Sequence, residues 1–267
     1  MVQSIALTIG VNSVDRDRYA DWPGTLYVAE RDARDMASLL KAHGFDCTTL
    51  VTEDATREAV TKNILNVAGK LKSGDLFVLT FAGHGTTLLD NNNDEDNHLD
   101  ETWCLYDSLI VDDELHQLWC AFAPGVRIVV VSDSCHSGSI QKQMHHQTLD
   151  AVPGAGLVRA MPRAIADRVA RAHKDSHHLG AAVLPQTVRA RLLLLAACEE
   201  DGKAIEGDQN GVFTAALKKV WGAGNFQGNY QQFREKIELA IANGQVPVLA
   251  TIGADAKTLT AESVFKI

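Results

Sequence analysis

Short apolar runs alternate with longer amphipathic stretches along this chain of 267 residues. The runs are rich in Val, Ile and Leu, as strands buried on both faces usually are, and the longer stretches have helical spacing. This alternation predicts an α/β protein whose helices cover a mostly parallel sheet. The expected strands are residues 4–10, 47–52, 75–82, 127–133, 191–198 and 246–252, and the expected helices are residues 30–43, 55–70, 113–119, 212–221 and 231–242.

Two segments interrupt the alternation. Residues 90–101 are polar and acidic, which predicts a long loop. Residues 141–186 contain three prolines and a basic run, and an insert of this length between core strands is usually functional or disordered. We expect the basic run to be exposed and mobile or weakly helical. Its basic residues are Arg159, Arg163, Arg168, Arg171 and Lys174.

Composition narrows the class of protein. A net charge of −9 argues against nucleic acid as a partner. The five cysteines are odd in number and form no CxxC pair, which favours free thiols in a reducing compartment. We find no signal-peptide pattern at the N-terminus and no apolar run near the ~20 residues of a membrane span. The expectation is a cytoplasmic protein without membrane or nucleic-acid partners.

A cysteine and a histidine follow two of the predicted strands. Cys135 comes just after the run at residues 127–133, and His84 lies between two glycines after the run at residues 75–82. The carboxyl ends of parallel strands meet at one edge of a sheet, where active sites form. Histidine can deprotonate a thiol there, and the backbone N–H groups of Gly85 and Cys135 can stabilise an oxyanion. Taken alone, a cysteine after a strand is more often a buried small side chain, and a histidine between two glycines is more often a loop residue.

Together the two motifs resemble those of metacaspases, a group of caspase-like cysteine peptidases. The resemblance is carried by residues 81–85 (FAGHG) and 133–139 (DSCHSGS), with further similarity at residues 111–115, 194–198 and 211–214. Cys135 follows His84 by 51 positions (135 − 84), close to the spacing of about 50 in caspases. The resemblance implies a three-layer α/β/α sandwich with a mostly parallel six-stranded sheet, in one domain over residues 1–267. It also implies a large-subunit-like region (1–140), a linker (141–186) and a small-subunit-like region (187–267).

The implied activity is hydrolysis of protein or peptide substrates after Arg or Lys by Cys135 and His84, in a monomer and without a cofactor for the chemistry. A buried basic side chain needs a carboxylate partner. Asp133 lies two residues before Cys135, so both side chains point to the same side of an extended segment. The resemblance adds Asp32 to this substrate pocket, although an aspartate there can instead cap a helix. The family often has serine at the position of Ala82.

Calcium is a candidate activator. The resemblance implies that Asp100, Asp112 and Asp113 bind Ca²⁺, whereas the expected fourth ligand position carries Lys142, whose charge opposes a cation. The alternative is a solvated acidic loop, with Asp113 near a helix N-terminus.

The basic run offers a second route to activation. A peptidase that prefers Arg or Lys would find its own substrate motif there, so cleavage by the chain itself or by an upstream protease can activate it. The alternative is an amphipathic helix with a solvated basic face. Two other functions stay open: a catalytically silent caspase-like scaffold that binds partners, and a caspase-like peptidase with a different specificity.

Overall fold

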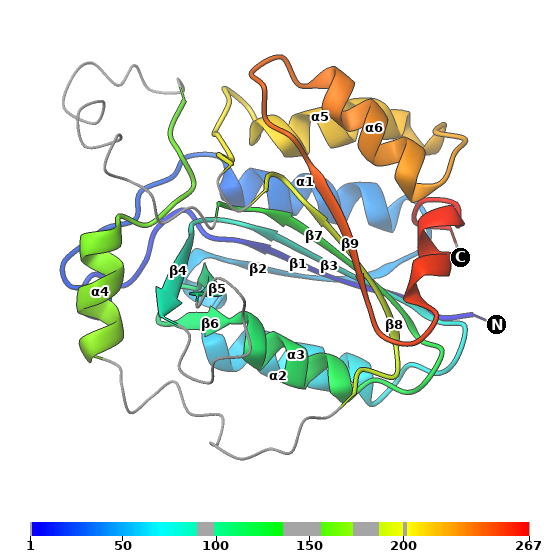
Figure 1. Cartoon of the computed structure of the whole chain (residues 1–267), viewed down its shortest axis with the longest axis horizontal. Helices are drawn as coiled ribbons and strands as arrows, with labels where there is room; N and C mark the ends of the chain where they lie inside the picture. Colours follow the sequence, from blue (N-terminus) through cyan, green and yellow to red (C-terminus); the bar gives the residue numbers. More distant parts are fainter. Residues whose placement is uncertain (1, 90–98, 136–155, 173–186, 200–201, 267) are drawn as a thin grey trace.

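The computed structural model describes residues 2–89, 99–135, 156–172, 187–199 and 202–266 (Figure 1). Its main sheet has six strands in the order β2-β1-β3-β7-β8-β9. The first five run parallel and β9 is antiparallel to β8, which confirms the predicted mostly parallel six-stranded sheet. These strands are β1 (Ser4–Gly10), β2 (Asp46–Val51), β3 (Leu76–Ala82), β7 (Arg127–Asp133), β8 (Arg191–Ala196) and β9 (Val248–Ile252).

Helices cover both faces of this sheet. Figure 1 shows α1, α5 and α6 on one face and α2 and α3 on the other. Every residue of β3 is buried, and its side chains alternate between two cores: Phe77 packs on the side of α2 and Val78 on the side of α1. The helices are α1 (Ala29–Lys41), α2 (Arg57–Ala68), α3 (Asp112–Cys120), α4 (Arg163–Ala172), α5 (Val212–Trp221) and α6 (Tyr230–Ala240), with short 3-10 turns at Thr52–Asp54, Gly222–Gly224 and Ala256–Ala261.

A small second sheet was not predicted. It consists of β4 (Gly85–Leu89), β5 (Leu99–Cys104) and β6 (Leu109–Val111), all antiparallel. The predicted loop at residues 90–101 is therefore wrong at its end, where residues 99–101 belong to β5, while residues 90–98 lie outside the described residues.

Part of the basic insert is a helix. Residues 163–172 form α4, which favours the helical alternative for this part of the basic run. The segments on either side of the described stretch, with Lys142 and Lys174, lie outside the described residues. Among the residues that the structure describes, no helix is long and apolar enough to cross a membrane.

The register of the main sheet brings three strand ends together. Ala82 of β3 lies opposite Asp133 of β7, and Ser132 lies opposite Ala196 of β8. The residues that follow β3, β7 and β8 therefore emerge side by side at the carboxyl edge of the sheet. His84, Cys135 and Cys198 are all in these positions.

Candidate active site

Cys135 and His84 lie at this edge, each two residues beyond a paired position of the sheet. Both are buried, with 0% and 6% of their surface exposed. The Cys135 thiol donates to the carbonyl of Ala204 (3.4 Å) and is also contacted by the Ala204 N–H. Among the residues that the structure describes, neither ring nitrogen of His84 has a hydrogen-bond partner of standard geometry, and no hydrogen bond joins His84 to Cys135. The thiol is held by the backbone at Ala204.

His84 is neutral in this arrangement. The pKa of its imidazole is lowered to about 3, mainly by burial and also by the positive charge of Arg159. The backbone carbonyl of Gly24 acts in the opposite direction but does not offset burial. The Trp22 ring lies against the imidazole, with ring centroids 4.8 Å apart. A neutral imidazole can accept a proton, as a general base must.

Cys198 is a second thiol beside Cys135. The contact with Cys135 raises the pKa of the Cys198 thiol, and burial raises it further. Its Sγ also lies 3.7 Å from the carbonyl oxygen of Ser134. Cys198 therefore remains protonated, and a protonated buried thiol is a poor nucleophile.

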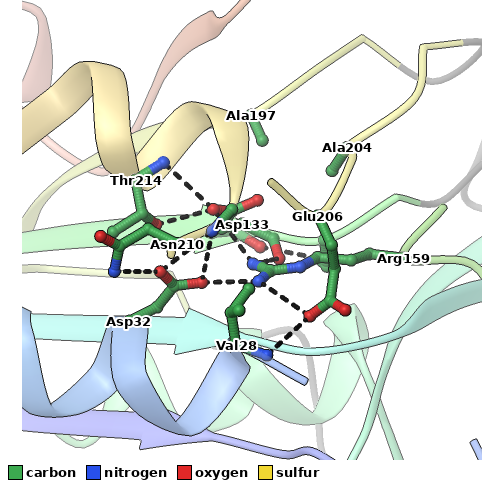
Figure 2. Close-up of polar contacts among 12 residues, drawn as sticks. Val28, Asp32, Asp133, Arg159, Ala197, Ala204, Glu206, Asn210 and Thr214 are labelled. Atoms are coloured by element: carbon green, nitrogen blue, oxygen red, sulfur yellow. Dashed lines mark hydrogen bonds and ion pairs between the residues drawn. The ribbon is translucent and has the colours of Figure 1, made fainter. Parts of the chain in front are cut away.

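Arg159 fills a pocket formed by the two predicted carboxylates (Figure 2). Its Nη2 lies 2.6 Å from Asp32 Oδ2, and its Nη1 lies 3.0 Å from Asp133 Oδ2. Arg159 is 0% exposed, so the expectation of an exposed basic run is wrong for this residue. Burial alone would lower the pKa of the guanidinium, but the carboxylates of Asp133 and Asp32 raise it above its ordinary value. The buried positive charge of Arg159 is thus stabilised by the negative charges of the two carboxylates.

The backbone of Arg159 is also hydrogen-bonded within the site. Its carbonyl oxygen accepts hydrogen bonds from the N–H groups of Gly85 (3.0 Å) and Cys135 (3.1 Å), and its own N–H donates to Ala204 (2.9 Å). On the upstream side the N–H of Glu206 donates to the Leu157 carbonyl (2.8 Å). Two residues downstream of Arg159, the N–H of Met161 donates to the Gly85 carbonyl (2.8 Å). Residues 157–161 therefore cross the site as a bound peptide does.

The pocket carboxylates are fixed from behind by other polar groups. Thr214 donates to Asp133 Oδ2 from its hydroxyl (2.6 Å) and from its backbone N–H (3.2 Å). Asn210 donates to Asp32 Oδ1 (2.8 Å), and the Gly211 N–H donates to both Asp32 oxygens (3.1 Å). The residue before α1 is Val28, and Asp32 lies inside the helix with its carboxylate bound to Arg159, so the alternative of Asp32 as a helix cap is wrong.

The carboxyl group of Asp32 has a raised pKa. This pKa is raised to about 6, with burial as the largest cause; the charge of Arg159 acts against this increase, and the negative charge of Asp133 adds to it. Ala82, by contrast, makes no polar contribution to the pocket: it packs in an apolar cluster with Leu26 and Ala29.

Sequence reasoning missed Glu206, the third carboxylate at the pocket. Its Oε1 lies 3.5 Å from Arg159 Nη2, and the residue is buried. It belongs to none of the sequence motifs. It reaches the pocket because Ile205 forms an isolated bridge with Val158 and the Glu206 N–H donates to the Leu157 carbonyl, contacts that no local sequence pattern indicates.

The residues predicted to bind calcium lie away from this pocket. Asp112 and Asp113 begin α3, and Asp100 is a buried residue of β5. The pKa of Asp112 is raised to about 7, mainly by burial and also by the negative charges of Glu101 and Asp113. Within the described parts of the chain, no group of three or more His, Cys, Asp or Glu side chains could hold a metal ion. These aspartates alone do not fit a calcium site, which needs six to eight oxygen ligands.

The other basic residues of the insert are placed differently from Arg159. Arg163 donates to Thr87 Oγ1 (3.2 Å) and pairs with Asp167 (3.0 Å). Arg168 and Arg171 lie exposed on α4. The structure brings none of these three into the pocket.

A six-stranded α/β/α sandwich with a cysteine and a histidine at adjacent strand ends is the arrangement of a caspase-like cysteine peptidase. The caspase-domain model of peptidase family C14 matches residues 3–257, and the chain belongs to this family. The caspase-1 structure from Spodoptera frugiperda has the same fold, with a TM-score of 0.57 at 13% identity over 95% of this chain and 88% of that one.

Three further proteins have higher sequence identity to this chain. A crystal structure of protein GSU0716 from Geobacter sulfurreducens is 37% identical, with a TM-score of 0.86 over 99% of this chain and 98% of that one. Metacaspase-4 from Arabidopsis thaliana is 33% identical over 53% of this chain and 35% of its own length. Metacaspase-1A from Neurospora crassa is 31% identical over 51% of this chain and 32% of its own. The match thus spans about a third of each of these two metacaspases.

Proposed function

We propose that this protein is a cysteine endopeptidase that cleaves peptide bonds after a basic residue. The observation that carries the proposal is Arg159: its side chain is held by Asp32 and Asp133 while its carbonyl oxygen accepts from two backbone N–H groups. A substrate's basic residue would occupy the same pocket. The carbonyl to be attacked would then lie beside the Cys135 backbone, within the reach of its thiol.

Cys135 is the proposed nucleophile and His84 the proposed acid and base. The Cys135 sulfur, having lost its proton to His84, forms a bond to the carbonyl carbon. The N–H groups of Gly85 and Cys135 hold the resulting oxyanion, at the positions that now bind the Arg159 carbonyl. The C–N bond then breaks and the proton on His84 goes to the leaving amine. Water, deprotonated by His84, hydrolyses the thioester and returns Cys135 to its thiol.

The attack requires a rearrangement of the thiol. Cys135 Sγ is engaged by the backbone of Ala204 and makes no hydrogen bond to His84. A rotation about the side chain of Cys135 would exchange the Ala204 contacts for the carbonyl carbon. Catalytic hydrogen bonds often form only when the reacting complex assembles, so the present geometry is compatible with this role.

Activation by cleavage of the chain itself follows from the same contacts. We propose that the bond between Arg159 and Ala160 is the one that Cys135 cuts first. As long as Arg159 stays in the pocket, a substrate must compete with a tethered side chain of high effective concentration. Cutting at this bond, by the chain itself or by an upstream protease, frees the pocket for other substrates. Arg163, Arg168, Arg171 and Lys174 remain candidate sites for an upstream protease.

A catalytically silent scaffold is the second candidate. The observation in its favour is that the two residues are not joined: the Cys135 thiol is bound to Ala204, and no hydrogen bond connects it to His84. In that case Arg159 would fill the pocket permanently, and the pocket would bind no substrate.

Incubating the purified protein and sequencing new N-termini separates the two. The peptidase proposal predicts a fragment that begins at Ala160, formed by the wild type and absent in Cys135→Ala. Cys198→Ala is the matched control, because it removes the neighbouring thiol while leaving the proposed nucleophile. An intact chain that also fails to label with an arginine chloromethylketone, even when Arg159 is replaced by alanine, would favour the scaffold.

Calcium activation stays a prediction. The arrangement of Asp112, Asp113 and Asp100 gives it little support, since any site there would need further oxygen ligands. Measuring self-cleavage in calcium and in a chelator tests it directly. An equal rate in both would remove calcium from the activation scheme.

A further inference from the structure

Glu206 changes the chemistry of the arginine pocket. Nη2 of Arg159 contacts both Asp32 (2.6 Å) and Glu206 (3.5 Å), whereas Nη1 contacts Asp133 (3.0 Å). Nη1 also donates to the backbone carbonyl of Asp133 (3.2 Å). The two terminal nitrogens of the guanidinium are therefore bound by acceptors on different sides of the pocket, as Figure 2 shows.

The Glu206 carboxylate is held in a fixed position. Its Oε2 accepts from the Tyr27 N–H (2.9 Å) and its Oε1 from the Val28 N–H (3.0 Å), both just before α1. Its own backbone N–H donates to the Leu157 carbonyl of the docked segment (2.8 Å). The side chain is buried, so it cannot swing out into solvent without losing these bonds. Acceptors fixed in this way discriminate between ligands by geometry.

Arginine and lysine present different geometries to such a pocket. The guanidinium is a planar fork whose nitrogens can each meet a separate carboxylate, whereas lysine ends in a single compact ammonium. That ammonium cannot occupy the positions of Nη1 and Nη2 at once. At least one of the buried carboxylates would then lack a cationic partner, and a buried charge without an opposite charge is costly.

We propose that Glu206 makes this pocket selective for arginine over lysine. The inference rests on the proposed peptidase function and narrows its substrate class to peptides with arginine before the cleaved bond. Asp32 and Asp133 bind the basic side chain in either case, and Glu206 adds the discrimination between the two. It is a specificity-determining residue that contacts the substrate side chain.

The test compares two fluorogenic peptides, Leu-Val-Arg and Leu-Val-Lys amides, whose first two residues are those of positions 157 and 158. The enzyme is the full chain after processing, as wild type and as Glu206→Gln. Glutamine keeps the shape and one acceptor oxygen but removes the charge. We expect a wild-type ratio of kcat/KM for Arg over Lys above about 100 and a decrease of about tenfold in the variant, since an ion pair between Glu206 and the guanidinium is lost. The decrease should come from slower cleavage after arginine.

Glu114→Gln is the matched control. Glu114 is also buried and paired with an arginine, Arg57, but it belongs to α3 on the opposite side of the sheet. Its replacement should leave the Arg-to-Lys ratio unchanged. Equal cleavage of the two peptides by the wild type, or an unchanged ratio in Glu206→Gln, would overturn the proposal. Equal losses on both peptides would overturn it as well, because Glu206 would then serve basic residues in general.

A failure of the peptidase function gives a different result. If the wild type cleaves neither peptide, selectivity is measured by calorimetry as binding to a Cys135→Ala, Arg159→Ala protein. Tighter binding of the arginine peptide, with the preference reduced when Glu206→Gln is added, supports arginine selection by a pocket that does not catalyse. Equal binding of the two peptides refutes the inference in either setting.

Discussion

Removing Arg159 should expose how much of the folded state depends on the charge in the pocket. In a Cys135→Ala background, which prevents self-cleavage, Arg159→Ala deletes a side chain that meets the carboxylates of Asp32, Asp133 and Glu206. Breaking a buried pair by removing one partner costs about 3–5 kcal/mol. At about 2–4 °C per kcal/mol for a chain of this size, the melting temperature should decrease by roughly 10 °C.

The decrease should depend on pH. With Arg159 in place the pKa of Asp32 is already about 6, and removing the cation raises it further. At pH 5 Asp32 then carries a proton and the pocket holds less negative charge, so the loss of stability is smaller than at pH 8. Thermal unfolding of the parent and of Arg159→Ala at the two pH values measures this difference.

Chemical rescue sharpens the test. Agmatine carries a guanidinium on a flexible chain, and binding to the folded state alone raises the melting temperature. It should stabilise Arg159→Ala and leave the parent unchanged, because the parent pocket is filled. Arg163→Ala is the matched control: Arg163 contacts Thr87 and Asp167 outside the pocket, and its loss should cost less than about 1 kcal/mol. A melting temperature for Arg159→Ala within about 2 °C of the parent at pH 8, with no response to agmatine, would refute the reasoning.

The remaining predictions concern titration and charge. The imidazole of His84 should titrate near pH 3 by NMR in Cys135→Ala and at higher pH once Arg159→Ala is added, because a nearby positive charge is gone; the same pKa in both would exclude that charge as a cause. For the processed wild type, whose pocket no longer holds Arg159, kcat/KM on arginine peptides should increase with pH at values above about 6, where Asp32 loses its proton; a flat profile there contradicts the assignment. Asp133→Asn should decrease kcat/KM on arginine peptides by at least about 100-fold, whereas Asp167→Asn on α4 should not.

The sequence predicted the main sheet well because its signal is local. Strands at residues 4–10 and 127–133 have the predicted limits, since apolar runs buried on both faces need no partner to be recognised. The small second sheet escaped prediction for the opposite reason. Its strands contain polar residues such as Thr86 and Thr102. These two threonines lie opposite each other in the second sheet, and both are buried in the folded protein.

The pocket could be predicted in part. Asp133 shares a motif with Cys135, so its place beside the site follows from strand geometry. The role of Arg159 did not follow, because a basic run gives no sign of which member is buried. In retrospect its neighbours differ from those of Arg168: apolar residues flank Arg159 on both sides, whereas Arg168 lies on the exposed face of α4. Glu206 depends on a contact across the fold that no local pattern encodes.

The pairing of β7 with β8 gains a new meaning if the chain is cut after Arg159. β7 lies upstream of that bond and β8 downstream, and residues 127–132 pair in parallel with residues 191–196. Met161, just beyond the cut, is fully buried in the core beneath α4. A processed molecule would therefore be two polypeptides in one particle, separated on a denaturing gel and inseparable by size exclusion. The pairing of β7 with β8 would become a subunit interface that is already formed in the uncut chain.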